Sequence, residues 1–389
     1  MADTLSEVAE WRRHIHALPE LGYEEVKTAA FVADKLRGFG IETHTGFATT
    51  GVVGVIEGKR GHGKHGLGRA IALRADMDAL PMTEMNHFAY VSTHAGRMHA
   101  CGHDGHTAML LGAARDLAAD PDFFGRVVLI FQPAEEALGG AQVMIEEGVL
   151  DRFGVEEVYG LHNWPQMPAG TIGVRAGPVM ASCDFFSLTI TGKGGHAAMP
   201  HLVVDPIVAA AQIVTALQTI ASRNAPPHEA LVVSVTQFHA GSADNVIAET
   251  TELRGTIRAF SPETRDLAAR RIGEIAKGVG EGFGVEVDYD YRRCFPATIN
   301  SEAESDAAAR AAASVVGAAN VRRSEPPSMT AEDFAFMLEA RPGCYIWLGQ
   351  GSAEHPRMLH SPTYDFNDTV IPTGIAWWKA IVTERLGQV

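Results

Sequence analysis

The sequence has little of what marks extracellular, membrane-spanning or nucleic-acid-binding proteins. Its 389 residues include only four cysteines, too few and too widely spaced for a disulfide framework. No apolar run approaches the roughly 18 residues that a membrane-spanning helix requires. Basic residues are also scarce, because 32 Lys and Arg stand against 47 Asp and Glu, giving a formal net charge of −15. An acidic chain without a basic block is poorly suited to a phosphate backbone. We therefore expect neither a membrane nor a nucleic acid as partner.

The first residues, Met1 to Glu7, contain no basic segment followed by an apolar one, so we expect no secretory signal. Together with the low cysteine content, this favours a cytoplasmic protein. The content of hydrophobic residues, 46%, is typical of a globular protein, and the length permits two or three domains. Histidine is plentiful, at 17 residues, and several histidines stand beside Cys, Asp or Glu. This is a first indication of metal chemistry.

Helical and strand patterns alternate in the first part of the chain. The predicted helices span 4–17, 24–38 and 105–119, and the predicted strands span 52–56, 70–74 and 126–131. This alternation predicts an α/β domain with a mostly parallel sheet. Helices and strands alternate again from about Ser301, and the chain ends in a predicted helix over 369–386.

The middle of the chain has a different order of elements. The succession is strand, helix, strand, strand, helix and strand, over 185–191, 205–221, 231–238, 252–260, 262–280 and 285–291. Ser261 and Pro262 are typical of the N-cap and the first position of a helix. The order is that of a ferredoxin-like α+β unit. We therefore predict one domain over 1–181 and 297–389, interrupted by an inserted domain over 182–296.

Four segments place possible metal ligands at or beside the ends of predicted strands. They contain Cys101 and His103, the pair Glu135 and Glu136, His162, and His360. Thiolate and imidazole groups are preferred ligands of zinc and similar ions. Each segment taken alone also has a simpler explanation: a chance Cys-x-His, an acidic first turn of a helix, or a structural histidine.

The recurrence of these segments favours a common site. The carboxyl ends of parallel strands converge at one edge of a sheet, so side chains that follow several strands can meet there. The five possible ligands are Cys101, His103, Glu136, His162 and His360. Five exceed the needs of a tetrahedral structural zinc and suit two ions with a shared thiolate or water. One of the paired carboxylates would stay free to accept a proton. The pattern indicates a dinuclear hydrolase without excluding the structural explanations.

The sequence resembles the M20 family of metallopeptidases and amidohydrolases, in particular its hippurate hydrolase and N-acyl-L-amino-acid amidohydrolase branch. The matching segments follow one another along the whole chain, over 12–22, 74–81, 101–106, 132–136, 160–162, 194–198, 330–334 and 359–361. The resemblance implies a metal-dependent enzyme that hydrolyses the amide bond of small N-acyl L-amino acids, aroyl or acetyl. The products would be a carboxylic acid and an amino acid.

The resemblance also implies roles for individual residues of the predicted α/β domain. The implied ligands of two divalent ions are Cys101, which would bridge them, with His103, Glu136, His162 and His360. Glu135 is implied as the general base. The wider family has a His-x-Asp ligand motif and a bridging carboxylate, and the segment of this chain that corresponds to the motif resembles Asp76-Met77-Asp78. Asp78 is therefore expected to hold a ligand histidine by hydrogen bonding, and Asp76 receives no definite role.

For the inserted domain, the resemblance implies the roles of a lid and a dimerisation domain. His196 is expected to reach the partner subunit's site and polarise the scissile carbonyl. Asn245 and Arg258 are expected to contact the substrate, with Arg258 at its carboxylate. We therefore expect a homodimer or a homotetramer.

Several points stay open at the level of sequence. The motifs do not fix the acyl group, nor do they choose among zinc, manganese, cobalt and nickel. Roles for His14, His16 and His201 are also open. One alternative function is a dipeptidase or aminopeptidase of the same family. Arg258 disfavours it, because a free α-amino group would call for an acidic counter-group. Another is a non-catalytic metal-dependent binding protein, which Glu135 disfavours because binding alone needs no base.

Overall fold

The computed structural model describes residues 2–61, 69–354 and 356–387, and the chain divides into two compact units. Unit 1 comprises Met1–Val179, Ile299–Pro326 and Asp333–Val389, and unit 2 comprises Met180–Thr298 and Pro327–Glu332. The mixed α/β class expected from the sequence is confirmed. The unit boundaries lie close to the expected ones, except for residues 327–332. These cluster with unit 2, because the amide of Ala181 donates to the carbonyls of Ser328 and Thr330.

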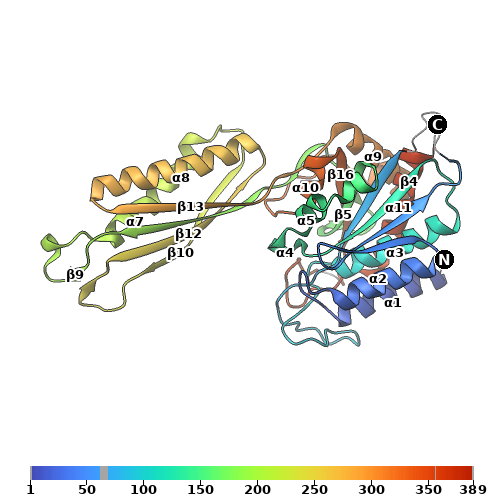
Figure 1. Ribbon diagram of the computed structural model, residues 1–389, viewed down its shortest axis with the longest axis horizontal. Helices are drawn as coiled ribbons and strands as arrows, with labels where there is room; N and C mark the ends of the chain where they lie inside the picture. Colours follow the sequence, from blue (N-terminus) through green and yellow to red (C-terminus); the bar gives the residue numbers. More distant parts are fainter. Residues whose placement is uncertain (1, 62–68, 355, 388–389) are drawn as a thin grey trace. The chain divides into compact units, whose positions relative to one another are not determined.

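Unit 1 is built on an eight-stranded sheet in the order β1-β2-β4-β3-β5-β16-β6-β15 (Figure 1). The strands are β1 (Glu42–Phe47), β2 (Gly51–Glu57), β3 (Ala70–Asp76), β4 (Arg126–Gln132), β5 (Val155–Pro168), β6 (Ile172–Gly173), β15 (Val321–Arg322) and β16 (Gly343–Gly351). The four central strands, β4, β3, β5 and β16, are parallel to one another. Strands β3 and β4 are buried along almost their whole length, because other elements cover both faces of the sheet there.

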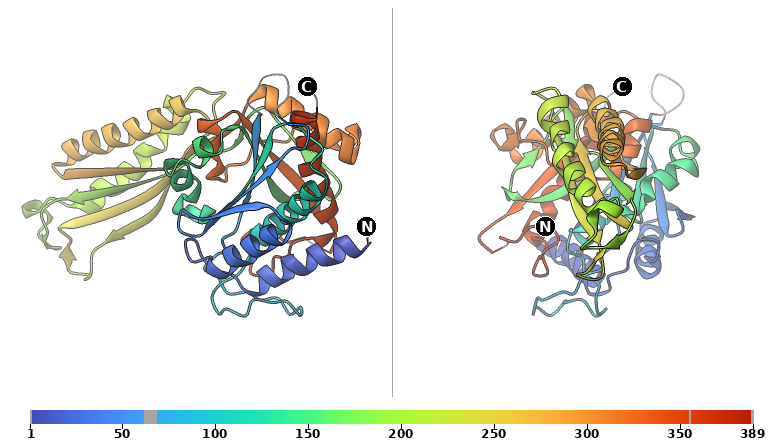
Figure 2. Two further views of the ribbon diagram at one scale, coloured as in Figure 1. Left: turned by 45° about the vertical axis from the view of Figure 1, so that its right-hand side comes forward. Right: turned by 90° about the vertical axis from the view of Figure 1, so that its left-hand side faces the viewer.

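Helices cover both faces of this sheet. One face carries α1 (Ala2–Ala17), α2 (Val26–Gly38), α3 (His103–Ala119), α9 (Glu302–Val316) and α11 (Ile371–Leu386), which share a core with inward side chains such as Leu73. Figures 1 and 2 show α1 alongside α3. Arg74, the next residue of β3, points to the opposite face. There it contacts Asp333 and the ring of Phe334, at the start of α10 (Phe334–Ala340).

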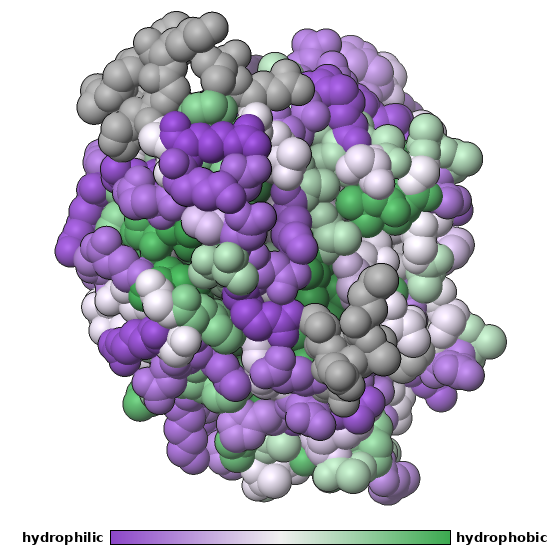
Figure 3. All heavy atoms as spheres, turned by 90° about the vertical axis from the view of Figure 1, so that its right-hand side faces the viewer, coloured by the Kyte–Doolittle hydropathy of each residue, from purple (hydrophilic) through white to green (hydrophobic). Residues whose placement is uncertain are grey.

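The short helices of unit 1 follow the carboxyl end of β4. They are α4 (Glu135–Leu138), α5 (Gly140–Glu146) and α6 (Val149–Arg152). No described helix of the chain combines the length and apolar character needed to cross a bilayer. The face of the molecule in Figure 3 is mostly hydrophilic, with apolar side chains scattered among polar ones, as is usual for a surface in contact with water.

Unit 2 contains a four-stranded antiparallel sheet in the order β10-β12-β8-β13. The strands are β8 (Cys183–Thr191), β10 (Leu231–Ala240), β12 (Thr250–Ala259) and β13 (Glu286–Phe295). Helices α7 (Pro206–Leu217) and α8 (Pro262–Phe283) pack on one face and share a separate core with Leu188, Leu253 and Ile257. The side chain of Ser261 caps α8 by accepting from the amide of Thr264. The ferredoxin-like order of elements is confirmed.

The short elements of the chain were not predicted. Strands β9 (Gly195–His196) and β11 (Val246–Ile247) form a two-stranded ribbon, and β7 (Gly177–Met180) pairs with β14 (Thr298–Asn300). The helix predicted over 205–221 ends earlier, at Leu217, and a π-helical turn follows over Ile220–Asn224. Strands of two to four residues give no periodic signal, since only their strand partners define them.

A buried group of charges attaches α1 to α3. Nδ1 of His16 lies 2.8 Å from Oδ2 of Asp104, and Nε2 lies 3.1 Å from Oε1 of Glu84. Arg12, also buried, lies 3.5 Å from Asp104 and 2.8 Å from Asp368. Burial alone would lower the pKa of His16, but the hydrogen bonds to Asp104 and Glu84 raise it to about 9. His16 is therefore a charged structural residue at neutral pH.

We predict a pH-dependent loss of stability in His16→Gln. Because the folded-state pKa is raised above the ordinary value of 6.5, the stabilisation is fully present below pH 6.5 and is lost as pH rises towards 9. The variant should unfold more easily than the wild type at pH 6, by on the order of 3 kcal/mol. The difference in free energy of unfolding between the variant and the wild type should be smaller at pH 9, as measured by urea unfolding. His14→Gln, exposed on the same helix, is the control. An equal gap at both pH values would contradict the prediction.

Candidate metal centre

All five predicted ligands lie in unit 1, four in segments that follow its parallel strands and His162 within β5. Cys101 directly precedes α3, and His103 is the first residue of that helix. Glu136 lies in α4, after the end of β4, and His162 lies within β5. His360 lies in the loop between β16 and the last helix, where its amide donates to the carbonyl of Ala100.

Two groups of possible ligands share Cys101. One group is Cys101, His103 and His162, and the other is Cys101, Glu136 and His360; the ligand atoms within each group lie within 4.8 Å of one another. Sγ of Cys101 lies 3.4 Å from Nε2 of His162. Nε2 of His360 lies 3.3 Å from Oε1 of Glu136. The geometry brings together all five residues, with the cysteine common to both groups, and their roles as ligands stay a prediction.

Hydrogen bonds orient two of the imidazole rings. Nδ1 of His103 lies 2.9 Å from the carbonyl oxygen of Asp78 and 3.2 Å from its Oδ1. Nδ1 of His162 lies 2.8 Å from the carbonyl oxygen of Asn163. Both rings therefore donate from Nδ1 and leave the Nε2 lone pair to the centre. Within the described part of the chain, Nε2 of His103 is buried without a hydrogen bond. This donor set fits divalent cations.

The pKa values of the candidate ligands indicate that protons compete with cations for these groups. Burial raises the pKa of the Cys101 thiol. Hydrogen bonds to Cys101 and Glu136 raise the pKa of His360 to about 10. Burial alone would lower the pKa of His103, but Asp76 and Cys101 raise it well above its usual value. Protons thus occupy positions that cations would take, so metal binding should release protons and strengthen as pH rises.

Glu135 lies beside the ligands because of an unusual turn. Ala134 has a φ of +57° and directly precedes α4, so both consecutive carboxylates reach the centre. His103, Glu135 and Glu136 form a further group whose ligand atoms lie within 4.8 Å of one another. The amide of Glu136 donates to Oδ2 of Asp78 at 2.9 Å. Asp78 therefore holds both His103, a candidate ligand, and the segment with the paired carboxylates.

Gly102, between the candidate ligands Cys101 and His103, cannot carry a side chain. Its φ is +102°, and a Cβ there would lie 2.3 Å from Oδ1 of Asn163 and 2.8 Å from the hydroxyl of Tyr364. Both the left-handed conformation and the close packing require glycine. The order Cys-Gly-His is therefore part of the construction of the site.

Apart from Asp78, the sequence did not identify the polar residues behind the candidate ligands. Asp76, which had no definite role, lies 2.6 Å from Nδ1 of His106 and accepts from Arg74 at 2.7 Å. Burial alone would raise the pKa of Asp76, but His103, Arg74 and His106 hold it well below its usual range. Nε2 of His106 lies 2.6 Å from Oδ1 of Asn163. Arg74, Asp76 and His106 lie within segments that resemble the family, and Asn163 directly follows one. This position was the only signal for them.

In unit 2, the structure brings two of the three predicted residues together. The amide of Ala197, next to His196, donates to the carbonyl of Asn245 at 3.1 Å, beside the β9–β11 ribbon. His196 is exposed. Its Nδ1 accepts from the amide of Ala198 at 3.1 Å, so Nε2 carries the proton of the neutral ring. Arg258 lies on a different element, β12, where it donates to the carbonyl of Ile257.

The remaining histidines of interest are on the surface. His14 is exposed and its ring packs at 4.9 Å from that of Phe31. His201 is exposed in a 3₁₀ turn over Pro200–Leu202. Neither of these surface positions indicates a catalytic role.

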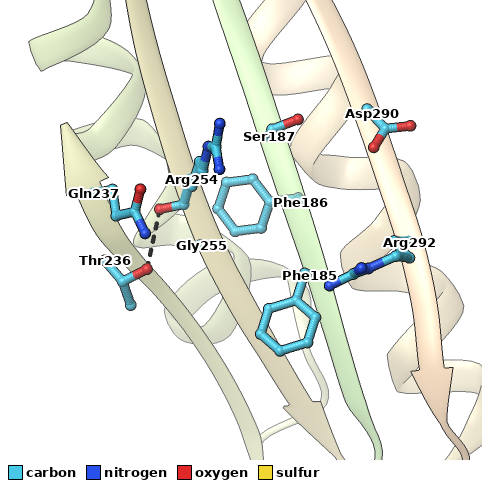
Figure 4. A pocket seen from close by; sticks show the side chains of 9 residues that line it. All are labelled: Phe185, Phe186, Ser187, Thr236, Gln237, Arg254, Gly255, Asp290 and Arg292. Carbon is cyan, nitrogen blue, oxygen red and sulfur yellow. Dashed lines mark hydrogen bonds between the residues drawn. The ribbon is translucent and has the colours of Figure 1, made fainter. Parts of the chain in front are cut away.

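Unit 2 also has a surface hollow of about 500 Å³ on the sheet face that α7 and α8 leave uncovered (Figure 4). Its polar lining includes Arg254, Ser187 and Asp290, which lie in one row across three neighbouring strands. Arg292 packs over the ring of Phe185 at its side. The lining of the hollow contains no predicted metal ligand or catalytic residue.

An α/β unit with two ligand groups that share a thiolate, next to an additional buried carboxylate, suits a metal-dependent hydrolase. The chain belongs to peptidase family M20/M25/M40, whose family model matches residues 72–384. It is 38% identical to a hippurate hydrolase of Campylobacter jejuni, over 99% of this chain and 98% of that protein. It is 45% identical to an N-acyl-L-amino acid amidohydrolase of Geobacillus stearothermophilus, over 74% and 77% of the two chains.

A solved structure has the same fold. The crystal structure of a dinuclear metal-binding peptidase of the M20 family from Bacillus subtilis matches with a TM-score of 0.87 and 33% identity. The match covers 100% of both chains. The resemblance to the M20 family is thereby confirmed.

We predict different metal losses for two ligand substitutions. The wild type should bind two divalent ions per chain. Cys101→Ala should weaken binding at both positions because both groups use its sulfur, whereas His162→Ala should weaken only one. Metal content per chain, measured after dialysis against limiting Mn²⁺ or Zn²⁺, checks this. The exposed His14→Ala is the control and should retain two ions. Loss of only one ion in Cys101→Ala would show that the sulfur is not shared.

Proposed function

We propose that the chain is a metal-dependent amidohydrolase that cleaves small N-acyl L-amino acids into a carboxylic acid and an amino acid. The observation that carries this proposal is the buried Glu135 carboxylate beside two ligand groups that share Cys101. The relatives support the substrate class. Hippurate is the benzoyl amide of glycine, and the second relative is named for N-acyl-L-amino acids.

The donor set indicates how the ions would be held. The residues that would hold them are Cys101, His103, Glu136, His162 and His360. When bound, the two ions supply Lewis acidity that polarises the amide carbonyl and lowers the pKa of water at the site. Zinc, manganese, cobalt and nickel all accept mixed nitrogen, oxygen and sulfur ligands, so availability would select among them.

In the proposed mechanism, Glu135 moves the proton. Its carboxylate accepts a proton from the attacking water and then delivers it to the nitrogen of the leaving amine. Its neighbour Glu136 is expected to hold an ion. The two consecutive residues would therefore have different tasks, with Glu136 binding metal and Glu135 transferring the proton. The turn at Ala134 supports this division, since it directs both side chains to the same centre.

Unit 2 is proposed to act as the lid and dimerisation domain. His196 would donate from Nε2 to the oxygen of the tetrahedral intermediate in the partner subunit's site. The hydrogen bond from Ala198 to Nδ1 supports this role, because it keeps the proton on Nε2. Asn245 and Arg258 would bind the substrate, with Arg258 at its carboxylate. A homodimer or homotetramer and a cytoplasmic location stay predictions.

We predict that Glu135→Gln keeps its metal and loses most of its activity. Gln preserves the shape of the side chain but cannot accept the proton, so kcat should fall by about 10²- to 10⁴-fold. Metal content per chain should remain at the wild-type value. Glu146→Gln, exposed on the following helix α5, is the matched control and should be fully active. A near-wild-type kcat in Glu135→Gln would remove it as the base.

A substrate panel tests the proposed function directly. Amino-acid release is measured from N-benzoyl, N-acetyl and N-indoleacetyl amino acids and from unblocked dipeptides, with metal-stripped and metal-restored protein. We expect metal-dependent cleavage of the acylated set only, because the substrate then presents a carboxylate to Arg258 and no free amino group. Cleavage of dipeptides alone would instead place the protein among the peptidases of the family. Cleavage of neither set by protein with two bound ions would favour a binding protein.

A further inference from the structure

Three buried carboxylates hold the segment that carries Glu135 and Glu136. Oε1 of Glu25 accepts from the amide of Ala134 at 2.8 Å, and Asp78 accepts from the amide of Glu136. The third carboxylate is Asp333, which is fully buried. It lies in the 330–334 segment that the family resemblance includes, yet neither the sequence nor the proposed mechanism gives it a role.

Asp333 joins the two ends of this segment. Nε2 of Gln132, the last residue of β4, donates to Oδ1 at 2.8 Å and lies 2.9 Å from Oδ2. The amide of Ala141, in the first turn of α5, donates to Oδ2 at 2.9 Å. Arg74 completes the cluster, with Nη2 3.1 Å from Oδ1. One side chain thus fixes the positions where the segment begins and ends.

The segment between these ends is tightly folded. A Cβ on Gly140 would lie 1.8 Å from the carbonyl oxygen of Pro133, so the two ends of the turn are in direct backbone contact. A shift at Gln132 or Ala141 would therefore displace the intervening Glu135. Asp333 also contacts that residue itself, since its amide donates to Oε1 of Glu135 at 3.4 Å.

The three anchors differ in what else they hold. Asp78 also contacts His103, so its loss would disturb a metal ligand. Glu25 connects Ala134 to the hydroxyl of Thr50, on the side of the turn that precedes Glu135. Among the three carboxylates, Asp333 is the one whose own backbone donates to the Glu135 carboxylate.

We propose that Asp333 is a positioning residue for the general base: it holds the turn from Gln132 to Ala141 so that the Glu135 carboxylate stands at the reacting water. This inference rests on the proposed role of Glu135. It differs from a general stabilising role, because it predicts a loss in the chemical step that depends on Glu135.

Asp333→Asn tests the inference with little change of shape. The new amide group cannot accept, so either Gln132 or Ala141 loses its hydrogen-bond acceptor. Misplacement of a catalytic group by about 1 Å can cost about 10²-fold in rate, so we expect kcat to fall 10- to 100-fold. KM should stay within about twofold, and metal content should stay at two ions per chain. A wild-type kcat in the folded variant, or loss of metal, would overturn the proposal.

The double variant Asp333→Asn/Glu135→Gln separates positioning from other effects. If Asp333 acts through Glu135, the substitution should lower the residual kcat of Glu135→Gln less than twofold. A full 10- to 100-fold loss in that background would overturn the proposal, because Asp333 would then act independently of the base. Wild-type activity of Glu135→Gln alone would instead refute the proposed function, and this outcome is measured separately.

Two further variants keep the test decisive. Glu157→Gln removes an equally buried carboxylate of unit 1, which pairs with Arg385 near the start of β5. It should lower the unfolding midpoint in urea but leave kcat unchanged.

If Asp333→Asn does not fold, Gln132→Met removes the hydrogen bond between Gln132 and Asp333 from the side of Gln132. It should give the same kcat loss with two ions bound, and unchanged kcat would overturn the proposal.

Discussion

The concentration of buried carboxylates at the carboxyl ends of the parallel strands is the constraint on which unit 1 depends. Asp76, Asp78 and Asp333 are almost fully buried, and buried charges are costly unless they are paired and hydrogen-bonded. Each one accepts from a backbone amide or a charged side chain, and Arg74 lies between Asp76 and Asp333. The polar layer behind the metal centre is therefore satisfied within the chain, and it fixes the turns that carry the ligands.

This construction prepares the site for its chemistry. The rings of His103 and His162 are oriented by bonds at Nδ1, so their second nitrogens need not be reorganised when an ion binds. The proposed base stands between two residues, Ala134 and Glu136, whose amides are held by buried carboxylates. A preorganised site of this kind lowers the barrier because the reacting groups are already in place.

Unit 2 differs from unit 1 in where its residues of interest lie. It has its own apolar core, and the buried Asp184 accepts from Arg265 at 2.7 Å within that unit. Its residues of interest lie at the surface: His196 and Asn245 are exposed beside a short ribbon. Exposure is what the proposed function requires of groups that act on a substrate held elsewhere, whereas the candidate ligands Cys101, His103 and His162 of unit 1 are buried.

The sequence by itself determined the class of fold, the order of elements in unit 2 and the five candidate ligands. It could do so because long periodic segments and short motifs such as Cys101-Gly102-His103 carry local signals. Only the tertiary structure decided that residues 327–332 belong with unit 2. It alone also revealed the contacts of Glu25, Asp76 and Asp333. These contacts join residues far apart in the chain, such as Gln132 and Asp333, and no local pattern encodes a pairing that packing alone creates.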